Sequence, residues 1–535
     1  MKKNILSLLL LFVSVFAYGA PIDNVRLAAS KGDSLAQYQL GNIYFNGIGV
    51  NRDYDLARSW YLKAANQGDV DAADSLGDIY YFGLGVKQDY KTAIEWYKKA
   101  YAYHELGYIY KNGIGTSKDE KIALQYYEKS ANESAYFIQF VIAGFYYNGW
   151  GTKRSVESAI KRLNEVPQEI LPIAKSIIDI ISDDKTEKNK FQTLKDNADK
   201  GDAYAQSVLG VMTITGIAVK QDYKTGMDML ILSGNQGNAS AQYIIGLLYT
   251  KNISFNYYEA VKWYQKAADQ GHRGAQNNLG FMYEMGQGGR LDFEESVKLY
   301  RKAADKGDKE AQYCMGFAYE FGQGVKRDYN EAVKWYKLSI EQGYPYAQYS
   351  LGLLYELGQG VKQDFKAAID LYKLSAEQGY ALAQYALANL YQKGLGIQKD
   401  DAKALEYYQK ASAQDNILAE ASLADMYYNG SAVNRDYGKA FDFYMLAAKR
   451  GLASAQYNMG KMYEYGHGVG KDYKEAFKWY SLAAQQNYAD AQCALGWLYE
   501  NGYGIKKDRQ EAFKWYKKSA ENGNVYAKQL LTEKI

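Results

Sequence analysis

Two short motifs in this 535-residue sequence contain residue types that serve in nucleophilic catalysis. Ser158-Ala159-Ile160-Lys161 matches S-x-x-K, and Lys224-Thr225-Gly226 matches K-T-G, two of the three motifs in which a serine attacks a carbonyl carbon. The third motif, Ser-Asp-Asn, is absent, and the two matches lie 66 residues apart. The aligned stretches elsewhere are ordinary helix residues. Because a motif counts only in its structural context, we interpret both matches as coincidental.

Histidine and cysteine are too few and too scattered to form a site. His104, His272 and His467 fall in different units of the repeat described next, two of them in turns. Cys314 and Cys493 fall in units five apart, beyond the reach of a disulfide. We therefore expect no catalytic residue, no metal site and no bound cofactor.

These residues must be positioned by a repeat, because a Leu-Gly pair followed three residues later by tyrosine recurs about every 36 residues. Alanine replaces the glycine twice. The glycine position falls at Gly41, Gly77, Gly107, Gly144, Gly210, Gly246, Gly280, Gly316, Gly352, Ala388, Ala424, Gly460 and Gly496. A fixed period of this length is typical of solenoids, in which one unit cannot bury its apolar face alone. The sequence therefore predicts an all-α, α/α solenoid of about 13–14 repeats.

Each unit predicts two helices, as residues 347–380 illustrate. The first carries an apolar stripe beside Gly352 and ends at Gly358; Asp364 then caps a second helix that runs to Glu377. Because a helical glycine costs about 1 kcal/mol relative to alanine, Gly352 indicates that a neighbouring helix backbone passes close by. A Trp-Tyr pair recurs on the second helix and is expected in the core: Trp60-Tyr61, Trp96-Tyr97, Trp263-Tyr264, Trp335-Tyr336, Trp479-Tyr480 and Trp515-Tyr516.

One stretch departs from the repeat. Between Gly144 and Gly210 lie 66 residues, which predicts a degenerate unit with helices near residues 169–181 and 190–200. We expect a kink there. The predicted organisation is a signal peptide at residues 1–19, an N-terminal repeat block at 20–165, the degenerate repeat at 166–200, and a C-terminal repeat block at 201–535.

The first residues are typical of a secretory signal. Lys2 and Lys3 precede an apolar run, and Ala17-Tyr18-Gly19 provides a small-x-small cleavage site. The run is shorter than the roughly 20 residues that a membrane span requires, and no later stretch is apolar enough. We expect an exported protein without a membrane span, either periplasmic or secreted.

Bulk composition agrees with a helical array. Four prolines are few and 55 tyrosines are many, which suits helices packed through rings whose hydroxyls can reach water. A net charge of +3 over 535 residues lacks the basic footprint of a nucleic-acid binder. Nucleic acid is therefore excluded as the expected partner.

The unit has the pattern A-x-x-L-G-x-x-Y-x-x-G-x-G-V-x-x-D-Y-x-x-A-x-x-W-Y-x-K-A-A-x-x-G, and residues 455–484 follow it closely. This pattern resembles the Sel1-like repeat, over nearly the whole chain except the degenerate unit. The resemblance implies a right-handed superhelix related to tetratricopeptide arrays and an adaptor role in protein complexes. Exported bacterial members have been linked to host interaction and virulence. A cysteine-rich subgroup has been described as β-lactamase-like, but it carries a cysteine pair in each unit, which this chain lacks.

The solenoid predicts where a partner would bind. The positions three before, one after and four after the glycine share one stripe of the first helix. Between Gly280 and Gly352 this stripe predicts an aromatic strip beside an acidic ladder, which would grip an extended protein segment bearing apolar and Lys/Arg side chains. We define these residues as the predicted strip: Asn277, Phe281, Glu284, Tyr313, Phe317, Glu320, Tyr349, Leu353 and Glu356.

The sequence leaves two functions open. The first is a non-enzymatic scaffold that binds a protein or peptide through the concave face, in cell-envelope assembly or with a host protein. The second is an enzyme acting on peptidoglycan or a β-lactam, by analogy with the cysteine-rich relatives. We favour the scaffold because fold alone does not transfer an activity.

Overall fold

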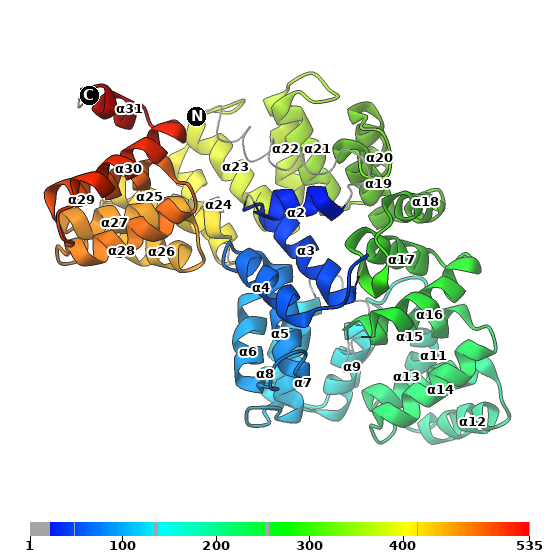
Figure 1. The fold of residues 1–535 in the computed structure, drawn as a ribbon. Coiled ribbons are helices and arrows are strands. Elements are labelled where there is room, and N and C mark those ends of the chain that lie inside the picture. The colour runs from blue at the N-terminus through cyan, green and yellow to red at the C-terminus, as the bar shows by residue number, and fades with distance from the viewer. Residues whose placement is uncertain are drawn as a thin grey trace. The chain divides into compact units, whose positions relative to one another are not determined.

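The computed structural model describes residues 22–30, 32–47, 49–131, 137–251, 256–414 and 416–533. The predicted signal peptide at residues 1–19 lies outside them. Across these described ranges the chain is helical without a strand, and successive helices pair through short turns (Figure 1). Within the same ranges, no helix has the length and apolar character needed to cross a membrane. The all-α fold is confirmed.

The helices fall into two compact units, each described by itself. The first holds α2 (Ile22–Ser30), α3 (Ser34–Asn46), α4 (Tyr54–Ala65), α5 (Val70–Phe82), α6 (Tyr90–Lys99), α7 (Tyr103–Asn112), α8 (Glu120–Ser130), α9 (Ile138–Asn148), α10 (Val156–Leu163), α11 (Leu171–Ile181), α12 (Glu187–Asp199), α13 (Ala203–Thr215), α14 (Tyr223–Asn235), α15 (Ala239–Lys251), α16 (Tyr257–Asp269), α17 (Arg273–Met285), η2 (Gln287–Gly289), α18 (Phe293–Ala304) and α19 (Lys309–Phe321). The second holds α20 (Tyr329–Glu341), α21 (Pro345–Leu357), α22 (Phe365–Glu377), α23 (Ala381–Lys393), α24 (Asp401–Ser412), α25 (Ile417–Asn429), α26 (Tyr437–Lys449), α27 (Ala453–Tyr465), α28 (Tyr473–Gln485), α29 (Ala489–Asn501), α30 (Arg509–Glu521) and α31 (Val525–Glu533).

The helix ends in each repeat follow from local chemistry. Gly358 adopts the left-handed conformation at φ 70° and its N–H donates to Leu354, which ends α21. The Asp364 carboxylate accepts from the N–H groups of Lys366 and Ala367 at 2.9 and 3.0 Å, which starts α22. The predicted second helix of this repeat, from Phe365 to Glu377, is confirmed residue for residue.

The recurring glycine makes room for a side chain rather than a backbone, so our expectation of a close helix backbone at Gly352 was wrong. A Cβ on Gly352 would lie 2.7 Å from Cε1 of Tyr372, a ring on the second helix of the same repeat. The glycines at 41, 77, 107, 246, 280, 460 and 496 face the equivalent tyrosine at 2.4–2.8 Å. We call the buried tyrosines at this position of the second helix, including those of repeats without the glycine, the core tyrosines: Tyr61, Tyr97, Tyr127, Tyr264, Tyr300, Tyr336, Tyr372, Tyr408, Tyr444, Tyr480 and Tyr516.

The tryptophans beside the core tyrosines lie nearer the surface. Trp263 and Trp335 are buried, whereas Trp60, Trp96, Trp479 and Trp515 are half-buried. A lysine three residues on covers several of these rings, as Lys63 Nζ does at 3.7 Å from the Trp60 ring centroid. The prediction of a core position is confirmed for the tyrosines and only partly for the tryptophans.

The backbones of α13 and α14 approach closely, and their repeat lacks the core tyrosine. In α14, Leu230 takes the place of that tyrosine and Gly226 takes the place of the alanine four residues before it. A Cβ on Gly226 would lie 2.6 Å from the Gly210 carbonyl oxygen, and a Cβ on Gly210 would lie 2.9 Å from the Gly226 oxygen. The core tyrosine therefore acts as a spacer, and the backbones of α13 and α14 meet where it is absent.

A ladder of side-chain amides runs along the array, with its rungs inside the repeats. In each rung, an amide just after the second helix donates to a buried glutamine on the first helix of the same repeat. The rungs are Gln236–Gln206, Gln270–Gln242, Gln378–Gln348, Gln414–Gln384, Gln486–Gln456 and Asn522–Gln492, at 2.7–2.9 Å. Most of these glutamines also donate to the last turn of the preceding repeat, as Gln384 does to the Ala376 carbonyl at 3.2 Å. One rung is ionic instead, with Arg450 donating to Glu420 at 3.0 Å.

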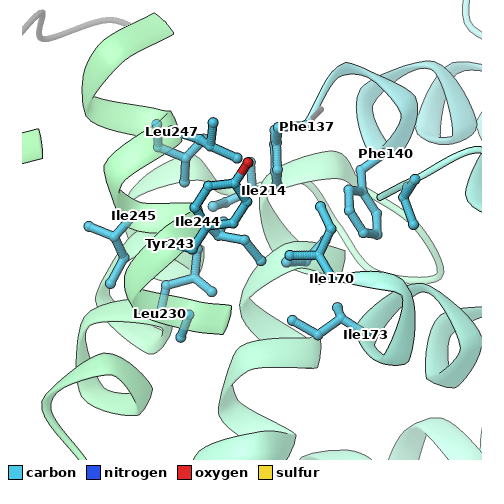
Figure 2. Packing of buried hydrophobic residues seen from close by; sticks show 14 of the residues in the cluster. Phe137, Phe140, Ile170, Ile173, Ile214, Leu230, Tyr243, Ile244, Ile245 and Leu247 are labelled. Carbon is cyan, nitrogen blue, oxygen red and sulfur yellow. The ribbon is translucent and has the colours of Figure 1, made fainter. Parts of the chain in front are cut away.

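The degenerate repeat forms the two predicted helices, although α12 begins at Glu187, three residues before the expected start. Its apolar residues join one core that runs from Phe137 to Leu299, part of which Figure 2 shows. Helix α13 packs directly on α9, since a Cβ on Gly144 would lie 2.4 Å from the Thr215 oxygen. The compact units part between Asp328 and Tyr329 instead, so residues 166–200 lie inside one unit. How the chain bends there stays a prediction.

Candidate protein-interaction surface

The acidic residues of the predicted strip bind core tyrosines and do not form a solvent-exposed edge. Glu284 accepts a hydrogen bond from the Tyr300 hydroxyl at 2.6 Å, and Glu356 accepts from Tyr372 at 2.9 Å. Glu320 is only 5% exposed. Burial raises the pKa of Glu284 and of Glu356, while the tyrosine hydrogen bonds act in the opposite direction. We therefore correct the expectation of an exposed acidic edge: these carboxylates satisfy buried hydroxyls.

The position after the glycine supplies the alternative acceptor. Tyr61, Tyr97 and Tyr408 donate to this position, at 2.7–2.9 Å, and the acceptors are Asn42, Asp78 and Asn389. Tyr444 donates to Asp425 in the same way. Where this position is aromatic, as at Trp497, the carboxylate four after the glycine accepts instead, and Tyr516 donates to Glu500 at 2.8 Å. Variation at this position therefore has a partly structural cause, which spacing alone did not reveal.

The remaining residues of the predicted strip differ in exposure. Phe281 is 48% exposed, and the rings of Tyr313 and Phe317 are half-buried with centroids 6.3 Å apart. Asn277 is buried at 8% exposure, and its Nδ2 lies 3.4 Å from Glu310, so it offers little surface to a partner.

The predicted strip is also divided between the two compact units. Residues 277–320 belong to the first and residues 349–356 to the second. In the second unit Tyr349 and Leu353 are half-buried, and the Tyr349 ring lies 5.7 Å from that of Tyr372. Binding by the strip stays a prediction, and its accessible rings in one unit are Phe281, Tyr313 and Phe317.

The catalytic motifs play structural roles. Ser158 lies in the first turn of α10, where its N–H donates to the capping Ser155 hydroxyl at 3.1 Å. Thr225 donates to the carboxylate of Asp222, the cap of α14, at 2.8 Å. Both hydrogen bonds are typical of helix N-termini. They agree with the interpretation that the two motif matches are coincidental.

The cysteines and histidines are dispersed among packed rings. Both cysteines are free thiols; burial raises the pKa of Cys314, and that of Cys493 to about 11, which disfavours the reactive thiolate. His104 packs on Tyr127 and His467 on Tyr437. Among the residues that the structure describes, no cluster of three metal-ligating side chains occurs.

A cavity of about 700 Å³ lies within the first unit. Its wall combines the rings of Tyr38, Tyr61 and Tyr257 with the buried polar groups of Asn42 and Asp78. Burial, with repulsion from Asp74 as the second cause, raises the pKa of Asp78. The cavity joins residues 38–84 to residues 256–289, segments that no motif or period in the sequence connects.

One histidine makes helix α17 sensitive to acid. His272 caps α17 by accepting from the Ala275 N–H at 3.3 Å, and burial lowers its pKa to about 4. Glu169 opposes this shift, while Arg273 and Lys306 add to it. Because the unfolded chain takes up the proton near pH 6.5 and the native state does not, native stability falls as pH drops from about 6.5 towards 4.

We expect His272→Asn to remove this acid sensitivity, since asparagine caps without titrating, as Asn416 does at α25. The difference in unfolding free energy between the variant and the native chain should grow by about 2–3 kcal/mol between pH 7 and pH 4. Urea unfolding of both proteins at several pH values measures it. A difference that is independent of pH would contradict the assignment.

Thirteen segments match the sequence model of the Sel1 repeat: residues 34–69, 70–102, 100–134, 139–161, 203–238, 239–272, 274–308, 309–344, 345–380, 381–416, 417–452, 453–488 and 489–524. A putative sel1-like repeat-containing protein, L18 of Acanthamoeba polyphaga mimivirus, is 45% identical over 42 residues, which are 8% of this chain and 7% of that protein. The chain therefore spans a small fraction of this relative.

Among solved structures, the chain is similar to c5321, described as a protective antigen present in uropathogenic Escherichia coli strains and displaying an SLR fold. That likeness has 29% identity and a TM-score of 0.56, and covers 96% of this chain and 91% of that one. A Sel1 repeat protein from Oxalobacter formigenes is also 29% identical, with a TM-score of 0.45, over 68% of this chain and 94% of that one. Together with the glycine–tyrosine packing found in repeat after repeat, the thirteen matched segments show that the chain belongs to the Sel1 repeat family.

Proposed function

We propose that this chain is an exported bacterial scaffold without catalytic activity, which binds a protein partner through the exposed rings of its first helices. Sel1 repeat solenoids generally act in protein–protein interaction. The observation that carries the proposal is Phe281, a large apolar side chain that is 48% exposed on a first helix; the next first helix carries the half-buried rings of Tyr313 and Phe317. Aromatic anchors of this kind dominate binding energy at protein interfaces.

Export and a host partner belong to the same proposal. The sequence signals at Lys2, Lys3 and residues 17–19 support export through a cleaved signal peptide. The similarity to a protective antigen of uropathogenic strains supports a partner outside the bacterium, because such an antigen is met by a host. Fractionation of the producing cell, with detection of the chain cleaved after Gly19, tests the first of these points.

We expect the double variant Phe281→Ala, Phe317→Ala to weaken partner capture at least tenfold while helicity is kept, since each buried ring contributes more than about 1 kcal/mol. Capture from periplasmic extract and from host serum, run in parallel and quantified by mass spectrometry, measures this. Phe513→Ala is the matched control, because Phe513 is 45% exposed on the second helix α30. Capture that survives the double variant as well as the control would sink the proposal.

A further inference from the structure

A cluster of rings lies where α27 turns into α28, within the second unit. The His467 ring stacks on Tyr437 with centroids 4.5 Å apart and planes 5° apart. Its Nδ1 lies 2.9 Å from the Tyr428 hydroxyl, so the imidazole is held by two rings of the preceding repeat. Tyr465, two residues before His467, is 56% exposed. An exposed ring therefore stands on a rigid support.

The following repeat, residues 489–524, also has a turn residue whose ring stacks on the repeat before it. Tyr503 occupies the turn position of His467 and stacks on Tyr473, with centroids 4.7 Å apart and planes 11° apart. Trp497 lies 5.0 Å from Tyr503, which remains 40% exposed. The corresponding turn positions in two earlier repeats hold Gln359 and Leu395, which have no ring to stack. The apolar anchors span two consecutive turns.

Three cations lie among these rings. Lys461 Nζ lies 5.9 Å from the Tyr428 ring centroid, and Lys471 Nζ lies 4.7 Å from that of Tyr473. Arg435 donates to the Tyr437 hydroxyl at 3.3 Å. Within the described residues, none of the three has a carboxylate at ion-pair distance, whereas Lys514 on α30 pairs with Glu511 at 2.8 Å. These cations are placed by aromatic rings, and Asp425 and Glu464 act on Lys461 and Lys471 only through longer-range attraction.

The nearby acidic groups are engaged within the protein. Glu464 is buried and accepts from the Tyr480 hydroxyl at 2.5 Å, and Asp425 accepts from Tyr444. Asp436 and Asp472 accept from N–H groups in the first turns of α26 and α28. These four carboxylates are therefore held by hydrogen bonds within the protein, whereas Lys461, Lys471 and Arg435 lie against rings. We name this region the ring–cation surface and define it by Lys461, Tyr465, His467, Lys471, Tyr473 and Tyr503.

We infer that the ring–cation surface binds an acidic peptide segment, in which Asp or Glu side chains alternate with apolar ones. The carboxylates would meet Lys461 and Lys471, and the apolar side chains would lie on Tyr465 and Tyr503. Charge complementarity selects this occupant over a basic segment, which the same cations repel. The inference rests on the proposed scaffold function and adds a second surface with a partner of stated chemistry.

Selection from an unbiased library of displayed peptides of about 12 residues tests this on the full chain. We expect the recovered peptides to be enriched in Asp and Glu relative to the starting library. The double variant Lys461→Glu, Lys471→Glu should bind them at least tenfold more weakly, and so should Tyr465→Ala, Tyr503→Ala. Affinity should also fall as NaCl rises from about 0.05 to 0.5 M. Circular dichroism checks that each variant keeps its helicity.

Lys517→Glu is the control, because Lys517 is an exposed lysine of α30 outside this surface. Recovered peptides that are basic, a selection that yields no acidic peptide, or acidic peptides that bind both double variants within twofold would each overturn the inference. If Phe281→Ala, Phe317→Ala still abolishes partner capture in any of those cases, the scaffold proposal stands and only this surface is refuted. If the acidic peptides bind as expected while that capture test fails, the ring–cation surface stands without the Phe281 anchors.

Discussion

Arg450→Ala should destabilise the second unit by about 3 kcal/mol, because it leaves Glu420 buried without its cation. Glu420 keeps only 3% of its side chain exposed, whereas Arg450 keeps 28%, so the loss falls at the lower end of the range for buried pairs. Hydrogen exchange of α25 and α26 should accelerate first, since the rung joins the start of one to the end of the other. Thermal unfolding supplies the global value.

The rescue is Glu420→Gln combined with Arg450→Gln, which rebuilds the neutral rung found in neighbouring repeats. Gln414 donates to Gln384 at 2.8 Å in the repeat before, and Gln486 donates to Gln456 at 2.8 Å in the repeat after. We expect the double variant to match or exceed the native stability, as replaced ion pairs often do. A double variant as unstable as Arg450→Ala would show that the pair is not exchangeable, and a loss below about 1 kcal/mol for Arg450→Ala would refute the burial argument.

Gly226→Ala should destabilise the first unit by about 3 kcal/mol, at the upper end of the cost of overpacking. The new Cβ would lie 2.6 Å from the Gly210 oxygen and 2.9 Å from the Ile214 nitrogen. These are backbone atoms of a packed helix, so no side chain can rotate away, and α13 and α14 must separate. Urea unfolding measures the change, and hydrogen exchange should place it in these two helices.

Gly438→Ala makes the same chemical change where a single side-chain atom is near. Gly438 lies in α26, and the nearest atom to its added Cβ is a carboxylate oxygen of Asp436, at 3.3 Å. Because alanine favours the helix, we expect a gain of up to about 1 kcal/mol. Equal effects of the two substitutions would mean that helix propensity, and not the contact with α13, decides the outcome at Gly226.

The period of the sequence was enough to predict the helices, their caps and the solenoid repeat family. These features depend on residues close together in the chain. The partner of each core tyrosine was not predictable in the same way. Spacing places Glu284 and Glu356 on one face of a helix, but it does not say that a hydroxyl from the second helix reaches them. Burial then depends on tertiary contacts, which reversed the expected role of the acidic ladder.

The ring–cation surface had a weak signal in the sequence. His467 and Tyr503 stand in turns where other repeats carry Gln359 or Leu395, but turn residues vary for many reasons. Only the stacking of both rings on the preceding repeat distinguishes them from ordinary turns. No sequence motif predicted the cavity lined by Asn42 and Tyr257, since its wall combines segments that are distant in the chain.

The choice between two acceptors for one core tyrosine has a consequence for how such chains diversify. The Tyr408 hydroxyl lies 2.9 Å from Asn389 Oδ1 and 3.1 Å from Gln392 Oε1, so a single repeat can hold both acceptors and donate its one proton to either. A lineage can therefore gain the second acceptor before it loses the first, and no intermediate leaves the buried hydroxyl unsatisfied. Once the acceptor four after the glycine has replaced the first one, the position after the glycine no longer has to accept the tyrosine hydrogen bond. It can then hold a ring, such as Phe281 or Trp497. Redundancy in the core thus opens a neutral route by which each repeat can acquire new surface chemistry.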